Sequence, residues 1–118
     1  MKNNIILEKS EEFALKIISL CKDLKDNKKE YIISNQLFRS ATSIGANIAE
    51  SVYAASSADF TNKLQIALKE ASETEYWLNL LYKSNYLEIK LFKLFDGKVK
   101  EIIKMLIASI NTCKSNVD

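Results

Sequence analysis

The sequence predicts an all-α fold, an up-down antiparallel four-helix bundle with a left-handed twist, in which residues 1–118 form one domain. Two observations carry this prediction. Apolar residues recur every three or four positions in four successive segments, which is the spacing of one helix face. The chain also contains no proline and only two glycines, whereas a β-rich chain of 118 residues would need several turn-forming residues.

The first helix is expected to run from Leu7 or Glu11 to Leu24. Ser10 precedes two glutamates and has the hydroxyl oxygen that an N-cap needs to accept a hydrogen bond from the first turn. The apolar stripe consists of Phe13, Ile17, Leu20, Cys21 and Leu24. The lysines that gather at the C-terminal end suit the helix dipole and need no ligand to explain them; they are Lys22, Lys25, Lys28 and Lys29.

The second helix is expected to run from about Ser34 to Ala55. Gly45 falls in its interior, where glycine costs about 1 kcal/mol relative to alanine. A neighbouring element is therefore expected to need the space that a Cβ atom would fill. The core stripe consists of Leu37, Ala41, Ile44, Ile48, Val52 and Ala55.

The third and fourth helices complete the predicted bundle. Ser56 or Ser57 is expected to cap the third helix, and residues 83–88 form a short connection to the fourth. Asp96 and Gly97 could form a turn, but the apolar period continues in phase across them, so one fourth helix is predicted. The two core stripes are Phe60, Leu64, Ala67, Ala71, Thr74, Leu78 and Leu81, and then Phe92, Phe95, Val99, Ile102, Leu106 and Ile110.

Polar side chains accompany the core stripes of the second and third helices. The third helix is also apolar beyond one narrow stripe, because Ile66, Trp77 and Leu80 widen it to one side, which indicates contact with another chain. Burying polar groups without partners costs about 1–3 kcal/mol each, so they are expected to pair internally or to face a second protein surface. The polar residues are Gln36, Ser40, Ser43, Asn47 and Glu50 on the second helix and Glu70 and Glu73 on the third.

Arg39 is the predicted partner of Glu70 and Glu73, either within one subunit or across an interface. It is the only arginine in the chain, and its planar guanidinium group suits carboxylates. Asn47 is expected to join this network as an amide that sets the alignment of the helices. The predicted polar network or subunit interface consists of Arg39, Asn47, Glu50, Glu70, Glu73 and Trp77.

The two glutamates do not by themselves predict catalysis. Carboxylates three residues apart share a helix face, but a di-iron bundle also needs histidine ligands, and the chain has no histidine. Glycoside hydrolysis needs a substrate cleft, for which the sequence offers no sign. We therefore expect no catalytic residues, no metal, no cofactor, no small-molecule substrate and no enzymatic activity.

Charge and targeting features predict a cytoplasmic protein. The formal net charge of +2 gives no strong bias toward nucleic acid. Cys21 and Cys113 are expected to be free thiols in a reducing cytosol. No apolar run approaches the ~18 residues of a membrane span, and the apolar run near the N-terminus is too short for a signal peptide, so no membrane partner is expected.

A basic stripe on the fourth helix is the candidate for nucleic-acid contact. Its lysines share the helix face opposite the apolar stripe, where they can contact phosphates. A solvated outer helix face explains the same lysines, and no aromatic residue interleaves with them to stack on bases. The stripe consists of Lys90, Lys93, Lys100 and Lys104.

The central segment resembles the bacterial four-helix-bundle family known as 23S rRNA intervening-sequence proteins. Two stretches carry the resemblance, QLFRSATSIGANIAES and then SSADFTNKLQIALKEASETEYWLNLL. Ser51 departs from the glycine that many members hold there, so the second helix is expected to continue past it. The resemblance implies a homopentamer in which the second and third helices build much of the subunit interface. Related proteins of diversity-generating retroelements are similar in fold and bind nucleic acid, and the family has no established catalytic residues to carry over.

The expected function is a non-enzymatic homo-oligomeric scaffold, a pentamer by the resemblance, that contacts RNA, DNA or a ribonucleoprotein. The resemblance and the lysine stripe both favour this hypothesis. The alternative is a protein–protein assembly hub that binds no nucleic acid. What copurifies with the native protein would distinguish the two.

Overall fold

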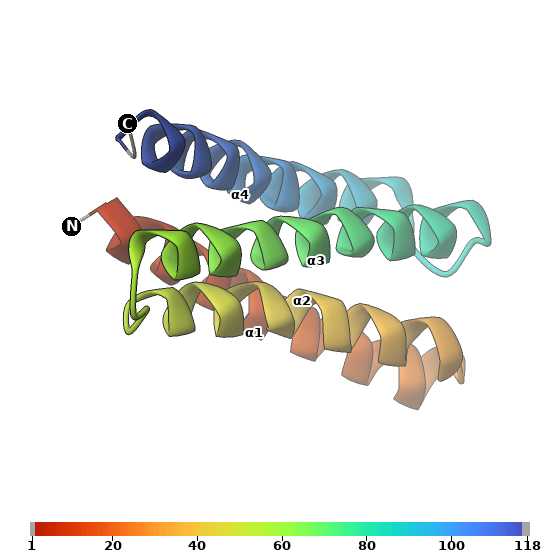
Figure 1. Cartoon of the computed structure of the whole chain (residues 1–118). Helices are drawn as coiled ribbons and strands as arrows, with labels where there is room; N and C mark the ends of the chain where they lie inside the picture. The colour runs from red at the N-terminus through yellow and green to blue at the C-terminus, as the bar shows by residue number, and fades with distance from the viewer. Residues whose placement is uncertain (1, 117–118) are drawn as a thin grey trace.

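The computed structural model describes residues 2–116, with side chains described for residues 5–115. It contains four α-helices and no strand within that range: α1 (Lys2–Lys28), α2 (Ile32–Ser51), α3 (Ser57–Lys83) and α4 (Ile89–Asn116). Consecutive helices run in opposite directions and pack against each other, and α4 returns beside α1 (Figure 1). The predicted all-α up-down antiparallel four-helix bundle is therefore confirmed. The bundle measures 50 × 21 × 20 Å, so its ends are small compared with its sides.

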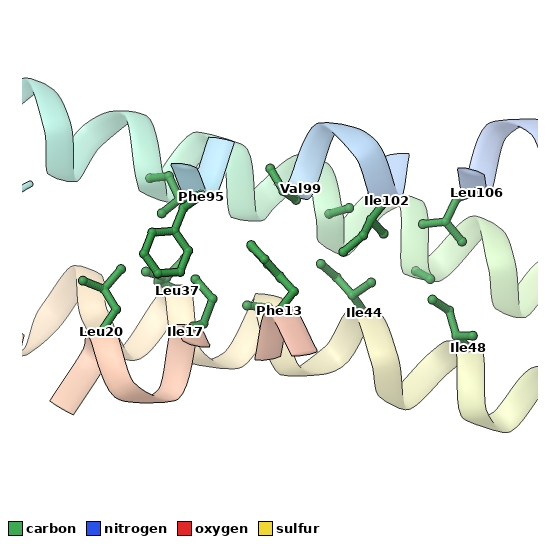
Figure 2. Packing of buried hydrophobic residues seen from close by; sticks show 14 of the residues in the cluster. Phe13, Ile17, Leu20, Leu37, Ile44, Ile48, Phe95, Val99, Ile102 and Leu106 are labelled. Atoms are coloured by element: carbon green, nitrogen blue, oxygen red, sulfur yellow. The ribbon is translucent and has the colours of Figure 1, made fainter. Parts of the chain in front are cut away.

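Buried aliphatic and aromatic side chains from all four helices form one continuous core. Phe13 of α1 meets Phe95 of α4 edge to face, with ring centroids 6.2 Å apart. Figure 2 shows core side chains of α1, α2 and α4 pointing inward toward one another. Each fully buried side chain of this size contributes about 1.5–3 kcal/mol, so the core is the main source of stability. Its fully buried members include Ile17, Leu24, Leu37, Ile44, Leu64, Leu78, Ile102 and Leu106.

The first helix begins earlier than predicted. α1 starts at Lys2, and Ser10, expected as the N-cap, lies inside the helix and donates a hydrogen bond to the carbonyl oxygen of Leu7 at 2.9 Å. Packing explains the difference, because Ile6 is buried in the core and extends the helix upstream. Ser10 itself is buried against Gly45 of α2, where an added Cβ atom would lie 3.2 Å from Ser10 Oγ. The glycine thus permits the close approach of α1 and α2.

The second helix ends earlier than predicted, at Ser51 rather than near Ala55. Val52 and Ala55 are exposed and do not belong to the core. Ser56 caps α3 by accepting a hydrogen bond from the backbone N–H of Asp59, whose carboxylate in turn accepts the backbone N–H of Ala55 at 3.1 Å. This reciprocal capping holds the chain in an extended conformation before α3, so α2 cannot continue through it.

Hydrogen bonds also define the turns at the other end of the bundle. Glu30 is buried, and its carboxylate accepts two backbone N–H groups at the start of α2, at 3.1 and 2.7 Å. Lys29 has a φ angle of 58°, a left-handed conformation that helps the chain reverse between α1 and α2. Residues 84–88 connect α3 to α4, close to the prediction, and α4 is continuous through Asp96 and Gly97 as predicted.

Candidate interaction site on the α2–α3 face

The polar residues singled out in the sequence lie where α2 and α3 pack side by side. We call the outer surface along this contact the α2–α3 face. Helical steps of three and four bring residues of each helix to it, and three ion pairs cross it. The face consists of Arg39, Ser43, Asn47 and Glu50 of α2 and of Lys63, Ile66, Glu70, Glu73, Trp77 and Leu80 of α3.

Arg39 joins the two helices near the middle of the face. Its guanidinium group forms an ion pair with Glu73 Oε1 and a second one with Glu70 Oε1, at 3.6 Å. The Arg39 side chain is 53% exposed, whereas those of Glu70 and Glu73 are 18% and 31% exposed. Because the cation is half in water, these pairs contribute much less to the stability of a free protomer than buried pairs would.

One carboxylate oxygen of this network is incompletely paired. Glu70 Oε1 is buried and has no hydrogen-bond partner among the described residues. Its distance of 3.6 Å from the Arg39 guanidinium group allows charge attraction but is too long for a hydrogen bond. Since a buried acceptor without a donor costs about 1–3 kcal/mol, a donor from outside the protomer would stabilise this arrangement.

Trp77 lies beside the glutamates with part of its ring uncovered. Its indole N–H donates a hydrogen bond to Glu73 Oε1 at 3.3 Å, and its ring packs edge to face against Tyr76, with centroids 5.1 Å apart. Trp77, Ile66 and Leu80 are each only partly buried, so apolar surface adjoins the polar network. Tryptophan is enriched at the centres of protein–protein interfaces, which makes this face a candidate contact surface.

Asn47 and Glu50 make contacts other than those expected. The Asn47 amide donates to the carbonyl oxygen of Ser43, one turn earlier in α2, at 2.9 Å and reaches neither glutamate of α3. Glu50 forms an ion pair with Lys63 at 3.0 Å, and this hydrogen bond raises the pKa of Lys63 above its usual value. Lys63 was not predicted from the sequence, although its spacing of seven residues from Glu70 places it on the same helix face.

A buried hydrogen bond between α2 and α3 lies beneath this face. Ser40 Oγ and Thr74 Oγ1 are 2.8 Å apart, and both side chains are buried. The Thr74 hydroxyl also lies 2.8 Å from the carbonyl oxygen of Glu70, and the Ser40 hydroxyl lies 3.3 Å from that of Leu37, so either hydroxyl can be the donor within the pair. The contact between the two hydroxyl groups requires the observed alignment of the helices, so it helps to set the register of α3 against α2.

The lysines predicted as a nucleic-acid stripe do not share one environment. Lys100 bridges two carboxylates, Asp96 at 2.7 Å and Glu75 at 3.0 Å, and these hydrogen bonds raise its pKa. Its charge is therefore already compensated within the protomer. The exposed lysines of the stripe that form no ion pair among residues 5–115 are Lys90, Lys93 and Lys104.

The cysteines are both free thiols. The buried thiol of Cys21 donates to the carbonyl oxygen of Ser34 at 3.3 Å, and burial raises its pKa to about 11, so it is not an activated nucleophile. Within the described residues, no cluster of three or more histidine, cysteine or acidic side chains could hold a metal ion. Nor does that part of the chain contain a helix both long and apolar enough to cross a bilayer.

Comparisons with known proteins bear on the identity of the chain. A family model described as 23S rRNA-intervening sequence protein matches residues 2–108. A crystal structure from Bacteroides thetaiotaomicron VPI-5482, of a protein with unknown function from the S23 ribosomal protein family, matches with a TM-score of 0.92 and 50% sequence identity. That match covers 94% of this chain and 99% of the other, and no curated protein matches. Because the family model spans nearly the whole chain, the protein belongs to the 23S rRNA-intervening sequence protein family.

Proposed function

We propose that the protein is a non-enzymatic homo-oligomeric scaffold whose copies associate through the α2–α3 face. The observation that carries this proposal is the buried Glu70 Oε1, which lacks a hydrogen-bond donor beside the partly uncovered Trp77. A neighbouring copy that covered the face would supply a donor and bury the indole ring. Glu73 is already held by Arg39 and Trp77, which suits a structural role better than a reaction. The family resemblance supports a ring of five subunits.

Contact with RNA or a ribonucleoprotein is the second part of the proposal. The family description refers to 23S rRNA, and exposed lysines without ion pairs are present on α4. The alternative is an assembly hub that binds only proteins. RNA binding by the purified protein at low salt would separate the two functions, because only the first predicts binding that weakens as salt rises.

A cytoplasmic location is also part of the proposal. Both cysteines are free, as is usual in a reducing compartment. Cell fractionation followed by immunodetection tests the location. Recovery of the protein from an extracytoplasmic fraction would contradict it.

Sedimentation equilibrium tests the assembly. The wild-type protein is expected to sediment as an oligomer at micromolar concentration. Trp77→Ala should raise the dissociation constant about 30-fold, because a tryptophan at the centre of an interface commonly contributes about 2 kcal/mol or more.

A matched control variant, Tyr53→Ala, removes an aromatic side chain that is 88% exposed in the turn between α2 and α3. It should leave the sedimentation mass unchanged. A monomeric wild-type protein would contradict the proposal. Equal weakening by Trp77→Ala and Tyr53→Ala would show that the α2–α3 face is not the interface.

A further inference from the structure

Lysine side chains gather at one end of the bundle, which we call the lysine-rich end. It consists of residues 22–36 and 79–94, the two turns and the helix ends beside them, and lies opposite the N- and C-termini (Figure 1). These residues include seven lysines and four carboxylates, an excess of three positive charges. The whole chain has a net charge of +2, so the rest of the molecule is net −1. The seven lysines are Lys22, Lys25, Lys28, Lys29, Lys83, Lys90 and Lys93.

The charge of the lysine-rich end is available to an external anion. Elsewhere, Lys9, Lys63 and Lys100 each contact a carboxylate at 3.3 Å or less, whereas none of the seven lysines forms an ion pair among residues 5–115. Lys29 donates to a backbone carbonyl oxygen. The carboxylate of Glu30 is buried and already accepts two backbone N–H groups.

Exposed apolar side chains accompany these lysines but do not form one patch. Tyr31 directly follows the α1–α2 turn and is 50% exposed. Ile32, the first residue of α2, is 79% exposed, and Ile89, Leu91 and Leu94, near the start of α4, are 44%, 39% and 48% exposed. Within the described chain α2 and α4 do not pack against each other, so the two isoleucines lie at diagonal corners of the bundle.

This arrangement fits a nucleic-acid chain better than a lipid surface. A peripheral membrane site inserts a continuous apolar face into the bilayer, which apolar side chains divided between the separate α2 and α4 corners do not provide. Single-stranded nucleic acid needs cationic groups that follow its phosphates and an aromatic ring on which a base can stack. The seven lysines supply the first, and Tyr31 supplies the second.

We propose that the lysine-rich end is the contact surface for single-stranded RNA, with ammonium groups on the phosphates and a base stacked on Tyr31. This inference rests on the RNA-contact part of the proposed function and places the contact at the end of the bundle instead of along α4. Lys90 and Lys93 belong to this surface. Lys100 does not, because two carboxylates hold it.

Fluorescence anisotropy with a labelled, unstructured short RNA tests the proposal at two salt concentrations. The end variant should bind at least about tenfold more weakly at low salt. The slope of the logarithm of its affinity against the logarithm of the salt concentration should become less steep by about 0.7 per lost phosphate contact. The control variant changes the net charge equally at exposed lysines outside the end and should bind like the wild type. The end variant is Lys28→Gln/Lys29→Gln/Lys93→Gln, and the control variant is Lys16→Gln/Lys69→Gln/Lys114→Gln.

Stacking has its own test. Tyr31→Ala should weaken binding by about tenfold, within the range found for base–aromatic stacking. Tyr53→Ala removes a more exposed tyrosine at the opposite end of the bundle and should not change the affinity. Circular dichroism of every variant confirms that the helices are intact.

Each other outcome overturns the inference in a recognisable way. Equal losses in the end and control variants would show that only net charge matters. Loss in the control variant alone would leave RNA binding in place but move it away from the lysine-rich end. A wild-type protein that fails to bind RNA at low salt would remove the RNA-contact part of the proposed function itself. Binding to phosphatidylglycerol vesicles without RNA binding would assign the end to lipid.

Discussion

Replacing Gly45 with alanine tests how closely α1 and α2 are packed at Ser10. In a helix interior alanine is more favourable than glycine by about 1 kcal/mol. The new Cβ atom would lie 3.2 Å from Ser10 Oγ but 3.6 Å from Ser10 Cβ, so only the hydroxyl group obstructs it. That hydroxyl is buried and donates to Leu7, and displacing it from its acceptor costs about 1–3 kcal/mol. We expect Gly45→Ala to change the free energy of unfolding by between zero and a loss of about 2 kcal/mol.

The Ser10→Ala background separates the two effects. Without the hydroxyl group the nearest neighbour of the new Cβ atom is Ser10 Cβ at 3.6 Å, an ordinary van der Waals contact, so Gly45→Ala should stabilise this variant by about 1 kcal/mol. The coupling energy between the two positions is then about 1–3 kcal/mol. Urea denaturation followed by circular dichroism, at one fixed protomer concentration, measures all four proteins. Equal stabilisation by Gly45→Ala in both backgrounds would refute the reasoning, because Ser10 would then not limit the approach of the helices.

Four further predictions concern the ion pairs and the thiols. Arg39→Ala should cost a dissociated protomer about 1 kcal/mol or less, because the Arg39 side chain is 53% exposed; a loss above about 3 kcal/mol in dilute urea denaturation would contradict this. Lys100→Gln should cost about 1 kcal/mol or less, and the difference from wild type should shrink in 1 M salt, as thermal unfolding at low and high salt would reveal. Burial raises the pKa of Cys21 from 9.0 to about 11, so the unfolded thiol loses its proton first and stability should fall as the pH rises from about 9 toward 11. Cys21→Ala should lack this part of the pH dependence. A thiol reagent at pH 8 should modify Cys113 before Cys21, because only Cys21 is buried. Equal rates of modification for the two thiols would show that Cys21 is not protected.

The helices could be predicted because core packing and helix geometry share one period. In α4 the apolar stripe stays in phase through Asp96 and Gly97, and the helix is unbroken there. Helix ends depend on contacts that a periodic pattern does not contain. Serine is a residue type that favours the N-cap position, so Ser10 resembles a helix start. Ile6, however, packs into the core upstream of Ser10, and the helix therefore begins before Ser10. The end of α2 at Ser51 depends on the capping hydrogen bonds that begin α3.

The residues of the α2–α3 face could be placed from their spacing, but their partners could not all be predicted. Arg39 contacts both glutamates of α3, as a long cation opposite two carboxylates should. Asn47 has a shorter side chain, and a carbonyl oxygen of its own helix is within its reach. Lys63 was overlooked because lysines on helix surfaces are common, and only its distance of 3.0 Å from Glu50 distinguishes it. The lysine-rich end could not be predicted from the sequence, because its two segments, residues 22–36 and 79–94, are far apart in the chain. Only the fold brings them to one end of the bundle.

Association in a ring would multiply the lysine-rich end. A rotation axis relates all copies, so every copy would place this end at the same level along that axis. A long RNA could then contact several ends at once, which raises the affinity by about 10²–10⁴-fold without any new kind of contact.

Dissociation of the ring by Trp77→Ala should therefore weaken binding of a long RNA by about a hundredfold or more. The same variant should bind a short RNA almost as well as the wild type, because it keeps every lysine of the end. Anisotropy titrations with both RNAs, at a concentration where only the wild type is assembled, decide the matter. Equal losses for the two RNAs would mean that Trp77 acts on the binding surface itself, and equal wild-type affinities for them would mean that the ends do not act together.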